Sequence, residues 1–286
     1  MPIYEQGYQR WNGELQERPL RWWPIVRQGV MAYLPQRKYL LLLGLAWIQK
    51  IFDGVQVYGR LKGGEVLEGL LGARVDAGMP FFWASMDNSM IWVVIFTIMV
   101  GSDLIAADRR GKALQLYFSK PITRNDYIVG KIGVIATFLL LTTWLPILLL
   151  WLFAVMIEPT TAYFARVWSV PLLMTVYSVL LVATAGMIML AVSATAQRSV
   201  FISVTWIVLF GYGFVPVIEL VQAITGFEAW SLINMAGNLG QIGAWWFGAE
   251  TGFDVPPVLA LGAVLVGIVA AYWWLRRKIE PVEVVL

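Results

Sequence analysis

Long apolar runs without internal charges dominate the sequence and predict most of its helices. A helix needs about 20 mostly apolar residues to cross about 30 Å of hydrocarbon. Four uncharged runs are long enough, at residues 132–157, 167–196, 199–218 and 255–275. The pattern therefore predicts four membrane-spanning helices, which take the third to sixth places along the chain.

Two earlier runs are also apolar, but charged residues interrupt them. The second span is predicted at about 84–107, with Asp103 near one end. The first is predicted at about 39–57 and contains Lys50 and Asp53, although a charge at the centre of a span costs about 2.5–3.5 kcal/mol. The two residues are three apart and can pair on one helical face. We interpret them either as a self-neutralising pair at the outer end of span one or as part of a lateral or central path.

Two further segments are neither spans nor simple loops. Residues 20–34 mix tryptophan and aliphatic residues with arginine and end at Pro35, a pattern typical of a helix lying in the membrane interface. Residues 230–246 are uncharged but short and rich in glycine, so we expect a re-entrant or short-helix segment. If this segment crossed the membrane there would be seven spans, and the basic residues 276–278 would lie on the wrong side.

The composition agrees with a membrane protein. Hydrophobic residues make up 59% of the 286 and charged residues 14%, far from the soluble average. We expect one all-α transmembrane domain over 1–286, with a cytoplasmic or interfacial segment at 1–38, a six-span bundle at 39–275 and a tail at 276–286. The charges and prolines of the first segment leave no room for the apolar core of a signal peptide. The chain has no cysteine or histidine, so we expect no disulfide and no metal or cofactor site in it.

The basic residues predict the orientation, because cytoplasmic loops are enriched in Lys and Arg. Six spans place both termini on one side, and that side collects most of the basic residues. The opposite side has only Arg60, Lys62, Arg74 and Arg166. We therefore expect both termini to be cytoplasmic, in the cytoplasmic (inner) cell membrane.

The loop at 101–131 carries a dense helix-breaking and helix-starting pattern. Gly111 is expected to end the helix of span two, and a short helix is expected over 112–119. Pro121 should stop that helix, since the residue before a proline avoids the α region. The short helix would present one apolar stripe, formed by Leu114, Tyr117 and Phe118.

The end of the same loop predicts an orderly start to span three. Thr123 can cap a new helix, and Asp126, three residues later, can complete a capping box. The stripe would thus be held off the membrane between two helices, as suits docking into a groove of a cytosolic partner. The basic residues around it are Arg109, Arg110, Lys112, Lys120, Arg124 and Lys131.

This loop and its flanks resemble the permease subunits of type-2 ABC exporters, the ABC-2 permeases. The resemblance rests on Ser119, Lys120, Pro121, Ile122, Thr123 and Arg124, followed by Asp126, Tyr127, Gly130 and Lys131. It extends to the six spans, the interfacial N-terminal helix and the segment before span six. In that family the loop is a coupling helix, so the resemblance implies that 109–120 contacts an ATPase and that 121–131 passes its motion into span three.

The resemblance also implies the partners. Two cytosolic ABC ATPase subunits would bind ATP and Mg²⁺, and a second permease copy or a homologous permease would complete the path in the lipid membrane. The chain itself lacks the G-x-x-x-x-G-K-[ST] pattern of a P-loop, since Lys131 is followed by Ile132. We therefore expect no enzyme activity in this chain and no nucleic-acid partner. Its substrate would be an amphiphile, lipid, drug or glycan.

Two other functions remain open from the sequence. A transporter driven by an ion gradient would need ionisable residues at bilayer depth, and the candidates are Lys50, Asp53, Asp87, Asp103 and Glu219. A membrane-embedded enzyme would have to rely on carboxylates, yet no paired-carboxylate motif occurs on a span.

Overall fold

The computed structural model describes residues 20–63, 77–118, 122–196, 198–210, 212–252 and 255–279. Throughout these ranges the regular structure is helical, with no strand. The first half of the chain forms α1 (Trp23–Tyr33), α2 (Arg37–Lys62), α4 (Met79–Asp87), α5 (Met90–Gly101), α6 (Ala106–Arg110), α7 (Ala113–Phe118) and α8 (Arg124–Thr142). The second half forms α9 (Trp144–Ile157), α10 (Thr161–Val167), α11 (Val170–Ser193), α12 (Ser199–Phe210), α13 (Val215–Thr225), the 3₁₀ helix η1 (Glu228–Ile233), α14 (Met235–Phe247) and α15 (Pro257–Lys278).

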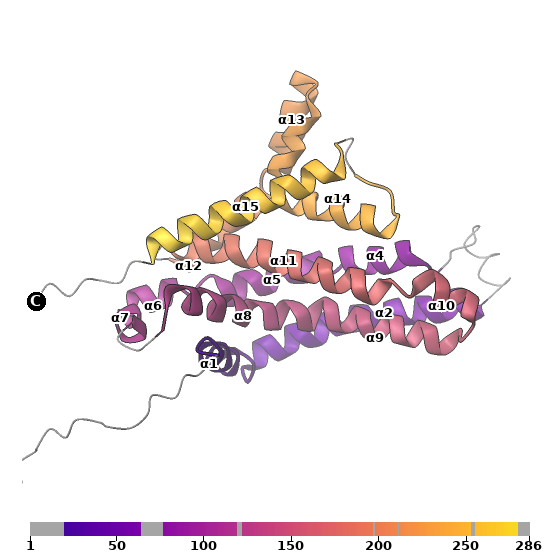
Figure 1. Ribbon diagram of the computed structural model, residues 1–286, viewed down its shortest axis with the longest axis horizontal. Helices are drawn as coiled ribbons and strands as arrows, with labels where there is room; N and C mark the ends of the chain where they lie inside the picture. Colours follow the sequence, from indigo (N-terminus) through magenta and orange to yellow (C-terminus); the bar gives the residue numbers. More distant parts are fainter. Residues whose placement is uncertain are drawn as a thin grey trace, which may run out of the picture.

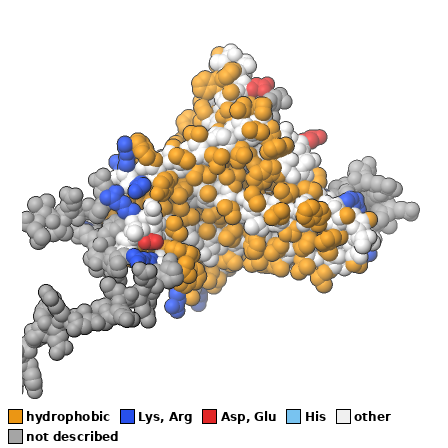
Figure 2. Space-filling view, in the orientation of Figure 1, with side chains coloured by type: hydrophobic (Ala, Val, Ile, Leu, Met, Phe, Trp, Pro, Cys, Tyr) orange, Lys and Arg blue, Asp and Glu red, His pale blue; other side chains and the backbone are white. Residues whose placement is uncertain are grey.

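Six helical stretches are long and apolar enough to cross a membrane, which confirms the expected number of spans. They are Arg37–Lys62, Met79–Arg110, Arg124–Ile157, Thr161–Ser193, Ser199–Thr225 and Pro257–Lys278. Hydrophobic side chains cover the middle of the molecule, and most of the visible Lys and Arg lie at its two ends (Figure 2). The protein is thus an all-α, multi-pass membrane protein.

Several spans that the sequence suggested as single helices are broken in the structure. Span three divides into α8 and α9 at Thr143, where φ is −114° and ψ is −69°. Pro146 lies just beyond the break and has no N–H to donate to the preceding turn, which is the usual cause of a kink. Span two breaks between α4 and α5, and span four between α10 and α11.

The fifth span differs most from its prediction. The sequence suggested one helix over 199–218, but α12 ends at Phe210 and a separate helix, α13, begins at Val215. Pro216 stands in the first turn of α13, where its missing N–H breaks no helical hydrogen bond. The new helix points away from the bundle (Figure 1).

Helix α11 lies at the centre of the bundle. It packs against α5, α8 and α9 on one side and against α12, α14 and α15 on the other (Figure 1). Its Tyr177 is fully buried, and Trp83 of α4 meets the Tyr177 ring edge-on, with the ring centroids 5.1 Å apart. Every long helix therefore has a neighbour in a single continuous core.

The glycine-rich segment at 230–246 forms η1 and most of α14. Asn234 caps α14 by accepting a hydrogen bond of 2.9 Å from the Gly237 backbone N–H. Helix α14 then packs against α15, α4 and α11. A Cβ atom on Gly243 would overlap the Trp83 ring, so glycine is what allows this close approach. The short-helix form of the prediction is therefore observed, whereas entry into the membrane stays a prediction.

The helix expected at 20–34 is present as α1, which crosses α8, whereas its place in the membrane interface stays a prediction. Two glycines of α8 make the contact possible. A Cβ on Gly130 would lie 2.8 Å from Ile25 Cβ, and one on Gly133 would lie 2.6 Å from a methyl group of Val26. The isoleucine and valine side chains are buried there. Small residues at such crossings let helix backbones come together.

Candidate functional site

The loop between spans two and three joins α6, α7 and the start of α8 at one end of the bundle (Figure 1). Helix α6 ends at Arg110, as expected from Gly111, but Gly111 itself has φ of −81°. The left-handed conformation falls on Lys112 instead, with φ of 54°. A lysine in this region carries steric strain that a glycine would not. The sharp turn is therefore two residues long, and Lys112 is exposed on it.

A serine at the end of α11 fixes the start of the loop. Ser193 is fully buried; its Oγ donates to the Ser102 carbonyl at 2.8 Å and accepts from the backbone N–H groups of Ile105 and Ala106, each at 3.2 Å. These bonds replace helical ones where the chain passes from α5 to α6. The guanidinium of Arg109 also donates to the carbonyl of Ala194. The loop is thereby attached to the central helix.

Asp108 connects α6 to span three. Its Oδ2 lies 2.6 Å from Lys131 Nζ and accepts a 2.7 Å hydrogen bond from the Tyr127 hydroxyl. The Lys131 and Asp108 side chains are only 8% and 17% exposed, so water screens the pair little. The lysine also lies over the Tyr127 ring, at 5.4 Å from its centroid. Asp108 was not among the residues expected from the sequence.

Tyr117 packs inward onto this cluster, which corrects part of the predicted docking stripe. Its ring meets that of Tyr127 edge-on with centroids 5.3 Å apart, and Lys131 Nζ lies 5.7 Å from its centroid. Burial, followed by the charge of Asp108, raises the pKa of Tyr117. Leu114 is also partly buried against the core. Leu114 and Tyr117 are therefore partly covered by the protein's own bundle and help to attach α7 to it.

Some of the remaining expected residues have the predicted geometry, and others lie outside the residues that the structure describes. Thr123 and Asp126 form the expected capping box, since Thr123 Oγ1 accepts from the Asp126 N–H at 3.1 Å and Asp126 Oδ2 accepts from the Thr123 N–H at 3.0 Å. Arg124 is partly buried at the first position of α8. The Phe118 side chain, Lys120 and Pro121 lie outside the described residues.

A small cavity of about 150 Å³ lies between α1 and this cluster. Its polar lining comes from Gln28, Tyr33, Asp103, Asp108, Tyr117 and Lys131. Burial is the main reason why the pKa of Tyr33 is raised to about 12, so its hydroxyl stays protonated at neutral pH. Asp103 also pairs with Arg110 at 2.9 Å, near the surface. Helix α1, the loop and span three therefore meet around one polar space.

A family comparison agrees with this arrangement of a six-span bundle and a structured inter-span loop. The model of the ABC-2 family transporter protein matches residues 63–235, more than half of the chain. The chain belongs to the ABC-2 transporter family. No match was found among curated proteins. The region matched includes the loop, the Asp108 cluster and spans two to five.

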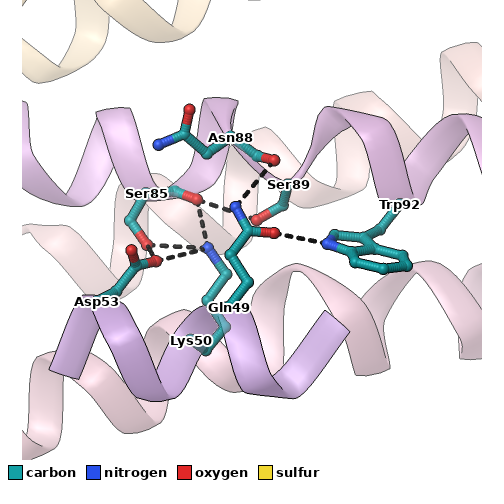
Figure 3. Close-up of polar contacts among 7 residues, drawn as sticks. All are labelled: Gln49, Lys50, Asp53, Ser85, Asn88, Ser89 and Trp92. Carbon is teal, nitrogen blue, oxygen red and sulfur yellow. Dashed lines mark hydrogen bonds and ion pairs between the residues drawn. The ribbon is translucent and has the colours of Figure 1, made fainter. Parts of the chain in front are cut away.

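This ABC-2 transporter also contains a buried ion pair in span one (Figure 3). Lys50 Nζ lies 3.1 Å from Asp53 Oδ2, and the two residues are 5% and 6% exposed. Ser85 of α4 completes the group: its Oγ donates to Asp53 at 2.5 Å and lies 2.9 Å from Lys50 Nζ, while its carbonyl also accepts from the lysine. Because α2 continues to Lys62, the pair lies within the helix rather than at its end.

The polar residues of span one meet span two at its break. Gln49 Nε2 donates to the Asn88 carbonyl at 3.2 Å, and the indole N–H of Trp92 donates to Gln49 Oε1 at 2.6 Å (Figure 3). The carbonyls of Ser85 and Asn88 lie where α4 ends, and α2 supplies a donor to each. The Ser85 carbonyl also accepts a 3.0 Å hydrogen bond from the Ser89 hydroxyl. This geometry supports the structural interpretation of Lys50 and Asp53, since both charges are neutralised and hydrogen-bonded within the protein.

Among the described residues, no group of three or more acidic side chains comes together as a metal site would require. Asp108 and Asp103 line the same cavity, but each already has a cationic partner. The charged side chains of the site therefore pair with one another, and the pair of Asp108 and Lys131 joins α6 to α8.

Proposed function

We propose that this ABC-2 transporter is the permease subunit of an ATP-driven exporter, with ATP and Mg²⁺ bound by separate cytosolic ATPase chains. The proposal takes the loop at 101–131 as the contact with an ATPase subunit. Two ATPase chains and a second permease, identical or homologous, would complete the complex. The substrate would be an amphiphile, lipid, drug or glycan. The protein would lie in the cytoplasmic (inner) cell membrane, with both termini in the cytosol.

The observation that carries this proposal is the buried contact of Asp108 with Lys131 and Tyr127. It joins the loop to the first two turns of α8, within span three. A charge-assisted contact of 2.6 Å with little exposure does not stretch easily. A displacement of α6 and α7 would therefore displace span three as well, as energy coupling in an exporter requires.

The surface offered to the ATPase follows from the side chains that point outward. Arg110 and Lys112 are exposed at the end of α6 and on the turn after it, whereas the guanidinium of Arg109 turns toward the Ala194 carbonyl. Leu114 and Tyr117 secure α7 to the bundle, so they would set the position of the surface rather than fill a partner's groove. We place the contact on this basic edge together with the outward side of α7.

Purification of the full chain from native membranes tests the proposal. We expect an ABC ATPase to copurify in equal copy number with the permease chains, because each ATPase would engage one loop. Replacing Arg110 and Lys112 together by glutamate should abolish copurification, while Arg109 is kept so that its contact with Ala194 still holds the loop in place. Recovery of the chain without any ATPase, under conditions that preserve other membrane complexes, would contradict the proposal.

A further inference from the structure

A hollow of about 600 Å³ opens beside the start of α12, at the same end of the bundle as the loop. Its lining combines two arginines with exposed apolar side chains: Arg110, Arg198, Ser199, Val200 and Phe201. Arg110 comes from the end of α6, whereas the other four begin span five. Two helices from distant parts of the chain therefore bring two guanidinium groups to one space.

The apolar part of the hollow continues along the outside of α12. Val200 is 71% exposed, Phe201 60% and Val204 56%. In a membrane these side chains face the hydrocarbon, because they lie on a helix of spanning length. The arginines thus stand where the hydrocarbon ends and the headgroups begin.

The end of α15 comes near the chain that leads into this hollow. The indole N–H of Trp274 donates to Thr195 Oγ1 at 3.2 Å, which brings the end of α15 close to the chain just before Arg198. Lys278 Nζ lies 5.1 Å from the centroid of the Trp274 ring. Lys and Arg side chains gather at this end of the molecule (Figure 2). Amphipathic tryptophans beside cations are typical of the headgroup level of a bilayer.

We infer that this hollow, between α6 and α12, binds the headgroup of an anionic phospholipid. The phosphate would accept hydrogen bonds from Arg198 and Arg110, since guanidinium groups match phosphate oxygens in a bidentate geometry. The acyl chains would lie along Val200, Phe201 and Val204. A free phosphate ion would leave these apolar side chains unused, so the continuous apolar face favours a lipid. Arg110 also belongs to the proposed ATPase contact, so the inference is tested at Arg198, which does not.

Arg198 is the residue on which the test depends. Its side chain is exposed, and it forms no ion pair with any other residue that the structure describes, unlike Arg110, which pairs with Asp103. Arg37 offers a matched control. It too begins a spanning helix and lines a hollow with exposed leucines, Leu40 and Leu41, but it is the only arginine lining that hollow among the described residues.

The experiment titrates the full-length protein, with any subunits that copurify, with phosphatidylglycerol, phosphatidylcholine or inorganic phosphate, and counts bound lipid by native mass spectrometry. We expect phosphatidylglycerol to bind more tightly than phosphatidylcholine. Arg198→Gln should weaken phosphatidylglycerol binding about tenfold, because it removes one of the two guanidinium groups that hold the phosphate. Arg37→Gln should change it by less than about twofold, because Arg37 does not line this hollow.

Three outcomes would overturn the inference: equal weakening by Arg37→Gln, equal binding of phosphatidylcholine, or full competition by inorganic phosphate. The first would indicate general surface charge, and the last a site for free anions. If Arg198→Gln does not fold, Val200→Glu provides the second test, because it places a carboxylate in the hollow at an exposed position. This variant should selectively weaken phosphatidylglycerol, and unchanged binding would again overturn the inference.

Discussion

Asp108 is the residue on which the loop's attachment to span three depends. Replacing it with Asn leaves Lys131 buried without a counter-ion, while Tyr127 keeps an acceptor for its hydroxyl. Loss of one partner of a buried pair costs about 3–5 kcal/mol, and we expect a value near the lower end because the Asp108 side chain is 17% exposed. Reversible unfolding in detergent measures the change in the free energy of unfolding.

Asp103→Asn is the matched control for this measurement. Asp103 pairs with Arg110, but both side chains are more than 40% exposed, so its loss should cost only about 0–1 kcal/mol. If the two substitutions lower the free energy of unfolding equally, the buried Asp108 pair stabilises the protein no more than the exposed Asp103 pair, which would contradict its role here.

At the scale of the helices, two glycines of α8 set how closely α1 packs against it. Gly133→Ala would place a methyl group 2.6 Å from a Val26 methyl, so α1 must shift or the protein must strain. We expect a loss of about 1–3 kcal/mol in the free energy of unfolding and faster proteolysis of α1. Thermal unfolding and limited proteolysis measure these effects.

Gly44→Ala provides the control at this scale. Gly44 lies within α2 and a Cβ there would meet nothing within 4 Å. Alanine should therefore be neutral or stabilise the helix by up to about 1 kcal/mol, since glycine is the poorer helix former. A loss at Gly44 as large as that at Gly133 would contradict a steric role for the α1–α8 contact.

The helices that the sequence predicted well are those specified by neighbouring residues. Uninterrupted apolar runs indicated the spans, and Thr123 with Asp126 indicated the start of α8, because both signals are local. The breaks near Ser89 and Phe214 were harder to predict. A helix inside a protein can break wherever another helix satisfies its carbonyls, as α2 does for α4, and that partner is distant in sequence.

The same reasoning explains what was missed at the candidate site. Asp108 meets Lys131 and Ser193 meets Ser102 only after the bundle has formed. Leu114 and Tyr117 had the spacing of an exposed docking stripe, but helical spacing identifies an apolar face without saying what covers it. Here the protein's own core covers part of that face.

At the scale of the whole molecule, two features lie at the same end of the bundle: the contact of Asp108 with span three, and the basic hollow beside α12. The loop is attached to α11 through Ser193, to α8 through Asp108 and, around the polar cavity, to α1. Motion of this end would therefore reach the central helix and span three together. The buried Lys50 and Asp53 group holds spans one and two at a different place, within the apolar region.

The absence of cysteine allows this motion to be measured at a single position. Lys112→Cys places one thiol on the exposed turn between α6 and α7, and Arg37→Cys, at the exposed start of α2 on the same predicted side of the membrane, serves as the control. The measurement is the rate of modification by a membrane-impermeant maleimide in inside-out native membranes, with and without ATP. The same rates are measured after alkaline stripping removes peripheral proteins.

If an ATPase docks on this loop, the thiol of the Lys112→Cys variant should be protected in native membranes and ATP should change its modification rate severalfold. Stripping should remove both effects, while the thiol of the Arg37→Cys variant is modified at a rate that neither treatment changes. A modification rate of the Lys112→Cys variant that is the same with and without ATP, and before and after stripping, would contradict the account of this chain as the permease of an ATP-driven exporter.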